Sequence, residues 1–343
     1  MTINARTLAI VERPICRITS VCPPMRDIIE RHQVWAYLIA VVLGLFVGWK
    51  TSPGEVGPDY MIWTLLGILL YTTFTQTPLT HLSEVFRDRQ FMGALLTGNF
   101  VVMPAITALL VLALPDNDAL KLGLLLVLLM PCTDWFVTFT HLGKGDSTRA
   151  VAATPVLLVA QLALLPLYLW LFLGSQFGVN LEFGRHLLPA FVGLIIVPLI
   201  LAFLTHKWAE DSRKASRFIR LTGLMPVPLL TVILFIVSMT QASQIASTGG
   251  IVWILMILFP TYLLAAALVG KGLRQIFRLS PETGRTVVFS LGTRNSFVVL
   301  PLALSMPEAW AAAVVVIVVQ SLVELFGMMF YLRWVPDRLL PNT

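Results

Sequence analysis

The sequence predicts an all-α polytopic membrane protein with about ten transmembrane helices. Of its 343 residues, 57% are hydrophobic and 12% are charged, and the mean hydropathy is +0.84. Soluble domains carry about 25% charged residues and cannot bury this much apolar surface. Apolar runs of about 20 residues, long enough to cross the hydrocarbon core, recur along the whole chain. The basic residues gather in alternate connections between these runs, as they do in membrane proteins.

The apolar runs divide the chain into ten expected spans with short connections. They lie near residues 33–50, 60–78, 90–114, 118–142, 147–174, 187–205, 220–240, 249–270, 281–305 and 308–333. None of the connections is long enough to hold a separate soluble domain. We expect one membrane domain preceded by a cytoplasmic tail, residues 1–32, which is polar and lacks the apolar segment of a cleaved signal peptide. Met25 is an alternative start of the chain.

The basic residues predict the orientation. Twenty of the 24 Lys and Arg residues lie in the tail, in the even-numbered loops or at the C-terminal end. The odd-numbered loops hold Lys50, Lys121 and Arg185, and Arg294 lies inside a span. By the positive-inside rule both termini are cytoplasmic and the protein resides in the cell inner (plasma) membrane. The pI near 9.5 therefore reflects topology and membrane lipid rather than binding to nucleic acid.

Ten spans divide into two halves of five, residues 33–174 and 187–335. Because five is odd, the second half is inserted upside down relative to the first, and the two form one intertwined domain as an inverted repeat. The fourth span of each half is interrupted by polar residues, Pro131–Asp134 in the first and Gly292–Ser296 in the second. A broken helix frees backbone groups that must face protein, water or ligand. Paired breaks are therefore a pointer to a transport site, although a proline kink alone would be structural.

Three charged residues, Asp134, Arg294 and Glu324, are expected inside the membrane, where charges are costly and mark pathways or pairs. If the broken helices cross, Asp134 and Arg294 can form an ion pair that only holds the halves together. Glu324 shares a helix face with Gln320, one turn earlier. A buried carboxylate without a basic partner can exchange a proton near neutral pH, which suits proton coupling. The alternative is a neutral, hydrogen-bonded Glu that packs helices.

Cys132 follows the break at Pro131 and is expected at the start of a half-helix, where the helix dipole favours a thiolate. A thiolate is a soft ligand suited to soft metals and metalloids. A buried Cys is otherwise a small hydrophobic residue. Cys16 and Cys22 lie in the tail without a metal-binding spacing, and we interpret them as free thiols.

No catalytic or nucleotide-binding motif accompanies these residues. The sequence has no phosphate-binding loop, no HExxH, no GxSxG and no His and Cys cluster at zinc-finger spacing. We therefore expect neither an enzyme nor a bound cofactor.

Four segments carry a family resemblance. The runs Leu129–Asp134 and His141–Asp146 resemble the cysteine-bearing fourth span of Acr-type arsenite efflux permeases, and Gln320–Glu324 resembles their glutamate-bearing late span. Gly292–Phe297 sits where that family has its Asn-rich break. The resemblance covers roughly residues 30–335. These permeases belong to the bile acid/sodium symporter superfamily.

The resemblance implies ten helices, an inverted repeat and two broken helices that cross between a core and a panel domain. It also implies export of trivalent arsenic, as arsenite with antimonite as a further candidate, by proton antiport that confers arsenical resistance. Cys132, as the metalloid thiol ligand, and Glu324 match the two residues linked to transport in that family. The expected substrate-binding residues are Cys132, Thr133, Arg294, Asn295 and Ser296. The expected residues for ion or proton coupling are Glu324, Asp134 and Gln320.

Asp134 and Arg294 are charged where uncharged residues are more usual in that family. A basic residue at the crossing can favour an anionic substrate. A sodium-coupled transporter of a small organic anion on the same fold therefore stays open as an alternative. Cys132 favours arsenite with H⁺ as the coupling ion, and Arg294 favours the organic anion with Na⁺.

Overall fold

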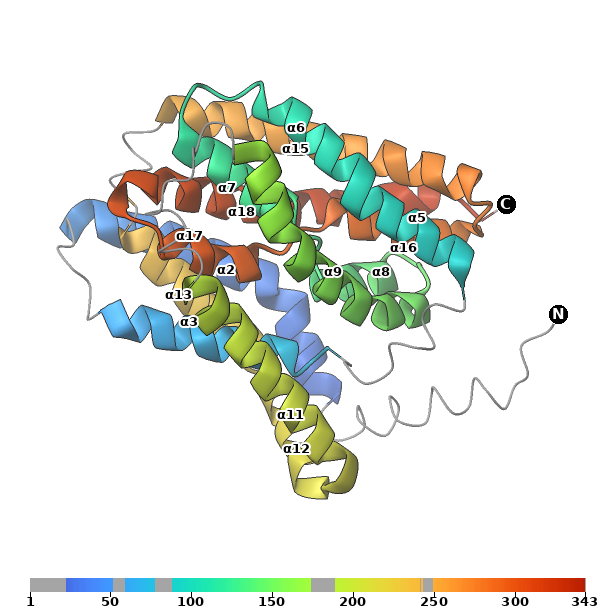
Figure 1. The fold of residues 1–343 in the computed structure, drawn as a ribbon, viewed down its shortest axis with the longest axis horizontal. Helices are drawn as coiled ribbons and strands as arrows, with labels where there is room; N and C mark the ends of the chain where they lie inside the picture. Colours follow the sequence, from blue (N-terminus) through green and yellow to red (C-terminus); the bar gives the residue numbers. More distant parts are fainter. Residues whose placement is uncertain are drawn as a thin grey trace.

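A computed structural model describes residues 23–51, 59–77, 88–173, 189–240, 242 and 249–342. Within these ranges the regular secondary structure is helical, apart from one isolated bridge between Pro131 and Arg294. The long helices pack against one another along much of their length (Figure 1). The predicted tail up to residue 22, with Cys16 and Cys22, lies outside the described residues, as does Arg185.

Helices occur where the sequence predicts spans. In the first half they are α2 (Pro23–Thr51), α3 (Asp59–Phe74), α5 (Arg89–Thr97), the π-helical turn η1 (Gly98–Val102), α6 (Met103–Val111), α7 (Asp118–Leu128), α8 (Trp135–Leu142) and α9 (Ser147–Leu173). In the second half they are η2 (Phe191–Ile196), α11 (Val197–Asp211), α12 (Arg213–Thr222), α13 (Pro226–Thr240), α15 (Gly249–Ile276), α16 (Pro281–Gly292), α17 (Ser296–Leu304), η3 (Glu308–Trp310), α18 (Ala311–Trp334) and η4 (Val335–Leu339). Helix α2 begins within the predicted tail, because proline is well suited to a first helical turn.

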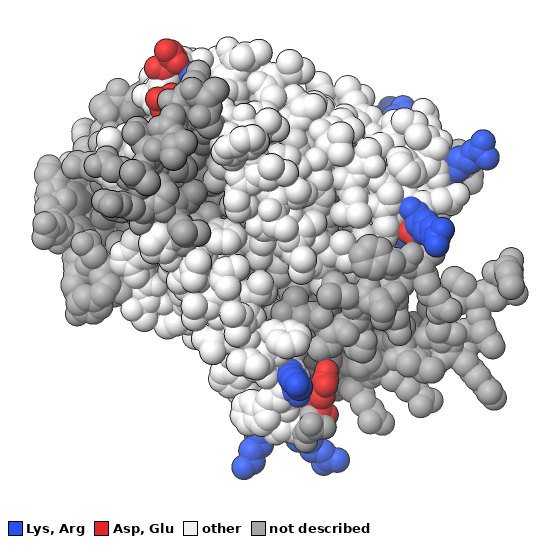
Figure 2. All heavy atoms as spheres, viewed as in Figure 1, with Lys and Arg blue, Asp and Glu red and all other residues white. Residues whose placement is uncertain are grey.

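Six helical stretches in the described part are long and apolar enough to cross a bilayer. They are Arg89–Val111, Ser147–Phe172, Phe191–Glu210, Arg213–Thr240, Gly250–Ile276 and Ala311–Leu339. Two shorter apolar helices, Trp35–Thr51 and Ile62–Phe74, fall at the first two predicted spans. On the face shown in Figure 2 the charged side chains lie at the margins, with uncharged residues between them. Composition and surface together are those of a multi-span membrane protein.

The helices pack as two groups (Figure 1). The first helix group consists of α2, α3, α11, α12 and α13, which contact one another in sequence-distant pairs such as α2 with α13 and α3 with α11. The second helix group consists of α5 to α9, α15, α16 and α18, with α15 against α16 and α7 against α18. Helix α17 packs against α18 of the second group and against α3 of the first. The half-helix that follows the second break therefore bridges the two groups.

A proline shapes the π-helical turn η1. Pro104 has no N–H, so the carbonyl of Phe100 lacks its usual helical donor. The hydroxyl of Tyr168 on α9 donates to this carbonyl instead, at 2.5 Å. This contact satisfies a backbone group that lipid could not and fixes η1 against α9.

Arg285 corrects the predicted map of loop charges. The sequence places it in a cytoplasmic loop, but its side chain is buried on α16. Its guanidinium donates to the carbonyls of Leu340 and Lys144, both at 2.9 Å, and to Oδ1 of Asn342 at 2.6 Å. Five N–H donors in a planar fork allow one arginine to join three segments. Arg285 thus ties α16 to the α8–α9 turn and to the C-terminal segment.

Gly44 and Gly48, one turn apart on α2, allow close approach to α13. A Cβ at Gly44 would lie 2.5 Å from the carbonyl oxygen of Phe235, and one at Gly48 would overlap the carbonyl oxygen of Met239. We expect Gly44→Ala and Gly48→Ala each to lower stability by about 1–3 kcal/mol through overpacking. Melting temperatures of the purified protein measure the effect. Gly67→Ala on α3 is the matched control, because a Cβ there meets no atom within 4 Å. Equal melting temperatures for all three variants would contradict the packing.

Candidate functional site

The two predicted breaks meet. Helix α7 ends at Leu128 and α8 begins at Trp135, while α16 ends at Gly292 and α17 begins at Ser296. Between them the two unwound segments run antiparallel and bridge at Pro131 and Arg294.

Backbone hydrogen bonds join the two segments at this crossing. The N–H of Cys132 donates to the carbonyl of Thr293 at 3.2 Å, and the N–H of Asn295 donates to the carbonyl of Met130 at 2.8 Å. Unwound backbone inside a membrane protein must find such partners. Each break therefore supplies hydrogen-bonding groups that the other has lost.

At the second break a side chain also bonds to free backbone, within its own segment. Oδ1 of Asn295 accepts from the N–H of Val298 at 3.3 Å and so caps α17. Asn is among the preferred residues at this position because its side-chain oxygen satisfies a free N–H of the first turn. The Nδ2 of Asn295 is buried without a hydrogen-bond partner among the described residues.

Helix α18 attaches to the second break through Glu324 and Gln320. Oε2 of Glu324 accepts from the backbone N–H of Arg294 at 2.9 Å and from Nε2 of Gln320 at 2.6 Å. The hydroxyl of Ser296 donates to Oε1 of Gln320 at 2.8 Å. The hydrogen bond between Gln320 and Glu324 confirms the prediction that these two side chains share one face of the helix. Glu324 is 1% exposed, and its Oε1 has no hydrogen-bond partner in the described part of the chain.

The guanidinium of Arg294 turns toward the second helix group. Its Nη2 donates to the carbonyl of Leu291 at 2.5 Å and to Oδ1 of Asn99 at 3.3 Å. Its central carbon lies 5.3 Å from the centre of the Tyr262 ring, a cation–π contact. Nε and Nη1 are buried without a hydrogen-bond partner among the described residues.

The ion pair expected between Asp134 and Arg294 is not among the contacts that the guanidinium makes with described residues. Arg294 folds back onto the end of its own half-helix α16, whereas Asp134 lies beyond the crossing as the residue before α8. The antiparallel pairing of the two segments brings their backbones together, while the guanidinium of Arg294 bonds to Leu291 and Asn99.

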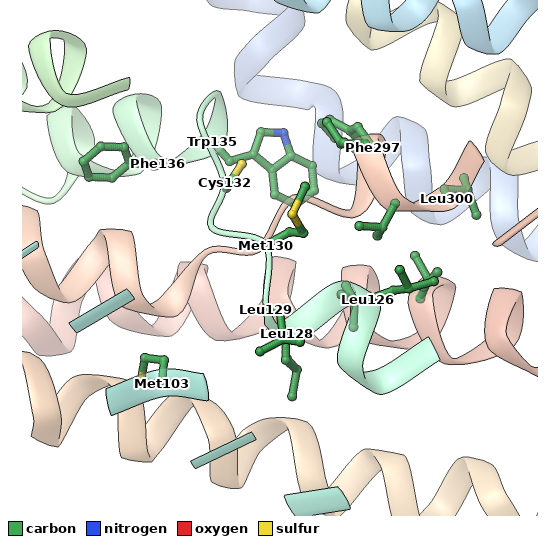
Figure 3. Close-up of a cluster of buried hydrophobic side chains, with 14 of the residues drawn as sticks. Met103, Leu126, Leu128, Leu129, Met130, Cys132, Trp135, Phe136, Phe297 and Leu300 are labelled. Atoms are coloured by element: carbon green, nitrogen blue, oxygen red, sulfur yellow. The ribbon is translucent and has the colours of Figure 1, made fainter. Parts of the chain in front are cut away.

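Cys132 is 1% exposed and lies in an apolar, aromatic setting. Figure 3 shows its thiol on the unwound segment beside Trp135. The indole of Trp135 meets Phe297 edge-to-face at 5.2 Å and stacks on Tyr37 at 6.0 Å. The expectation that Cys132 starts a half-helix is wrong, because its backbone pairs with Thr293 and α8 begins only at Trp135. The helix-dipole argument for a thiolate therefore does not apply in this conformation.

A pocket lies next to the crossing, between the two helix groups. Its walls come from α2, α13, α17 and α18 together with Trp135, and the surface that they expose to the pocket is apolar. Ser296 and Ser321 are among the lining residues, but their hydroxyls donate to Oε1 of Gln320 and to the carbonyl of Ile317. Of the predicted substrate residues, Ser296 lines this pocket, whereas Cys132, Thr133, Arg294 and Asn295 are buried in the crossing behind it.

Three residues of the site, Asn99, Ser290 and Tyr262, were not predicted. Asn99 lies in the π-helical turn η1, where its Nδ2 donates to Oγ of Ser290 at 2.9 Å and its Oδ1 accepts from Arg294. A π-turn within a helix frequently marks a functional position. The sequence feature that could have identified Asn99 is its amide side chain inside an otherwise apolar span. Nothing in the sequence distinguishes Tyr262 from any other buried aromatic residue.

An apolar helical protein with two interrupted helices that cross, and with charged side chains held at the crossing, has the architecture of a secondary transporter. The model of the Sodium Bile acid symporter family matches residues 63–248. This match covers more than half of the chain, and the chain belongs to that family. It is accordingly a membrane transporter, and the family and the relatives described next are transporters rather than enzymes.

Individual relatives include two kinds of protein. The chain is 22% identical to the arsenical-resistance protein Acr3 of Corynebacterium glutamicum, over 93% of this chain and 93% of the relative. It is 28% identical to sodium/bile acid cotransporter 4 of Homo sapiens and 27% identical to that of Rattus norvegicus, in each case over 60% of this chain and 47% of the relative.

Asn99 holds the guanidinium of Arg294 and the hydroxyl of Ser290 at once. We expect Asn99→Leu to lower the stability of the purified protein by about 1–3 kcal/mol, because it removes one of the two oxygens that Nη2 of Arg294 reaches and the donor that bonds Oγ of Ser290. Asn99→Asp keeps an acceptor oxygen for Arg294, and we expect its stability to fall less than that of Asn99→Leu. Thermal melting of both variants tests this order. A leucine variant as stable as the wild type would contradict the contact.

Proposed function

We propose that this chain is a secondary active transporter that exports trivalent arsenic in exchange for protons and so confers arsenical resistance. Arsenite is the main substrate, with antimonite as a further one. The observation that carries the proposal is the position of Cys132 in the crossing, where its backbone is bonded to the opposite break. The similarity to an arsenical-resistance protein over 93% of both chains supports it.

The chemistry of one thiol suits a carrier. Near neutral pH arsenite is a small uncharged hydroxide of trivalent arsenic, and a thiol is a soft ligand for such a metalloid. In the exchange an As–O bond breaks and an As–S bond forms, and the thiol proton leaves with the hydroxyl group as water. The reverse reaction, with water as the nucleophile, releases arsenite. A single thiol permits this reversal, whereas three thiols would hold the metalloid.

We assign proton coupling to Glu324. Its carboxylate accepts two hydrogen bonds at Oε2, and its buried Oε1 has no hydrogen-bond partner in the described residues. Buried intramembrane carboxyl groups commonly serve as proton carriers. Because Oε2 is bonded to the backbone of the second break, a change of protonation acts directly on the crossing. Gln320 and Asp134 complete the coupling residues, and Thr133, Asn295 and Ser296 complete the substrate site with Cys132 and Arg294.

The proposed topology is ten spans in two inverted halves, residues 33–174 and 187–335. Each of the two helix groups contains spans from corresponding parts of both halves, with α2 and α3 beside α11 and α13. This arrangement supports an inverted repeat. Both termini are placed in the cytoplasm by the distribution of Lys and Arg, and the protein in the plasma membrane.

Replacing the thiol tests the substrate. In cells without their own arsenite exporters, the wild type is expected to lower arsenite accumulation, and Cys132→Ser is expected to return it to the level of empty cells. The hydroxyl of serine is a poor ligand for trivalent arsenic, although the volume and burial of the side chain are nearly kept. The double variant Cys16→Ser/Cys22→Ser keeps Cys132 and serves as the matched control. Wild-type export by Cys132→Ser at equal membrane levels would remove the thiol from the mechanism.

Replacing the carboxyl group tests the coupling. Glu324→Gln keeps an oxygen acceptor for the N–H of Arg294 but cannot ionise, so we expect arsenite export to lose its dependence on an imposed pH gradient. Everted membrane vesicles with defined internal and external pH provide the measurement. If arsenite flux still followed the pH gradient in this variant, another group would carry the proton.

A sodium-coupled transporter of a small organic anion is the second candidate. Nε and Nη1 of Arg294 and Nδ2 of Asn295 are buried donors without acceptors among the described residues, which would suit carboxylate oxygens. Similarity to sodium/bile acid cotransporter 4 also supports it. Uptake of labelled carboxylates in the presence of sodium, together with unchanged arsenite accumulation, would favour this candidate.

A further inference from the structure

Oxygen acceptors gather around the end of half-helix α16. The carbonyl of Leu291, in its last turn, accepts from Arg294 and, at 3.4 Å, from the hydroxyl of Tyr262. Oδ1 of Asn99 reaches the same guanidinium, and the carboxylate of Glu324 binds the backbone N–H of Arg294. All of these side chains are buried. The arrangement combines a carbonyl, an amide oxygen, a carboxylate and an aromatic face.

Such a set of groups is suited to a monovalent cation. In secondary transporters, carbonyls of unwound backbone and the C-terminal ends of half-helices coordinate the coupling cation, because the helix dipole is negative there. Oxygen ligands are those that hard cations prefer, and aromatic faces also attract cations. In this chain a covalently attached cation, the guanidinium of Arg294, contacts the carbonyl of Leu291, Oδ1 of Asn99 and the face of Tyr262, while the carboxylate of Glu324 binds the backbone N–H of the same residue.

We propose that the guanidinium of Arg294 is a built-in cation that takes the place of a mobile coupling cation at the crossing, so that the protein neither binds nor requires sodium. The guanidinium stays protonated at all physiological pH values, and its charge therefore does not enter or leave during the transport cycle. A second cation among the same oxygens would meet a like charge in a medium of low dielectric constant. Removal of the guanidinium is expected to expose a sodium site built from the oxygens of Asn99, Leu291 and Glu324.

The proposal deepens the proton-coupled function proposed above, but its test does not depend on arsenite. The full-length protein is purified in detergent, and its melting temperature is compared in sodium chloride and in choline chloride at equal concentration. The wild type is expected to melt at the same temperature in both salts. Arg294→Ala is expected to melt lower in choline and to regain about 2 °C or more in sodium, since a ligand that binds only the folded state raises its stability.

Three further variants make the result specific. Arg294→Lys keeps a tethered cation and is expected to show no sodium effect. Arg294→Ala/Glu324→Gln removes the carboxylate ligand and is expected to lose the sodium effect of the single variant. Arg285→Ala removes a second buried arginine, one that bonds to groups outside the crossing, and is expected to melt lower in both salts alike.

Two outcomes would overturn the proposal. One is a sodium-specific rise in the melting temperature of the wild type, which would instead favour sodium coupling. The other is an Arg294→Ala protein that melts cooperatively at the same temperature in both salts. If Arg294→Ala cannot be purified in choline, its yield in sodium is the readout, with recovery only in sodium supporting the proposal and recovery in neither salt overturning it. Arsenite transport is measured in a separate experiment. Failure of the proposal about Arg294 would therefore not count against arsenite as the transported substrate.

Discussion

The antiparallel pairing of the two unwound segments is the constraint on which the rest of the structure depends. Interrupting a helix inside a membrane leaves N–H and C=O groups that lipid cannot satisfy. Here the bonds from Cys132 to Thr293 and from Asn295 to Met130 let each interruption stabilise the other. Neither break is expected to persist alone, because its free groups would then be buried without partners. The crossing therefore fixes α7, α8, α16 and α17 relative to one another.

Placing charged and reactive side chains at this crossing follows from the same constraint. The breaks already need polar partners, so a carboxylate on α18 can serve as an acceptor for the N–H of Arg294 while staying available for a proton. The carbonyl at the end of α16 similarly accepts from the guanidinium of Arg294. One buried region thus combines a thiol, a carboxylate and a fixed positive charge. Cys132 and Arg294 lie on the two paired segments and Glu324 binds the backbone of the second, so a change at one of these residues can reach the others directly.

The crossing contacts both helix groups, so movement of one group against the other would act around it. Helix α17 begins at the second break and packs against both groups. The neighbouring pocket is lined by α2 and α13 of the first group and by α17 and α18. Rocking of one group against the other would therefore change access to the pocket while the crossing stays intact, as alternating access requires.

Much of the fold could be predicted because hydrophobic length and loop charge report directly on the membrane. The breaks were visible as Pro131 and the polar run at Arg294 within apolar spans. The partners of those side chains were not visible, since they depend on the register of two segments far apart in the sequence. Their opposite charges suggested an ion pair between Asp134 and Arg294. In the structure the guanidinium of Arg294 bonds to Asn99 and Leu291. Arg285 was assigned to a loop because nothing in the sequence shows that C-terminal carbonyls fold back onto it.

The most direct test of the account is arsenite transport by the purified protein in liposomes that contain no other protein, with an imposed pH gradient. The account predicts that arsenite accumulates on the acidic side against its own gradient and that a protonophore abolishes the accumulation. Arsenite that stays at the level of protein-free liposomes, while a labelled carboxylate accumulates with sodium, would contradict it.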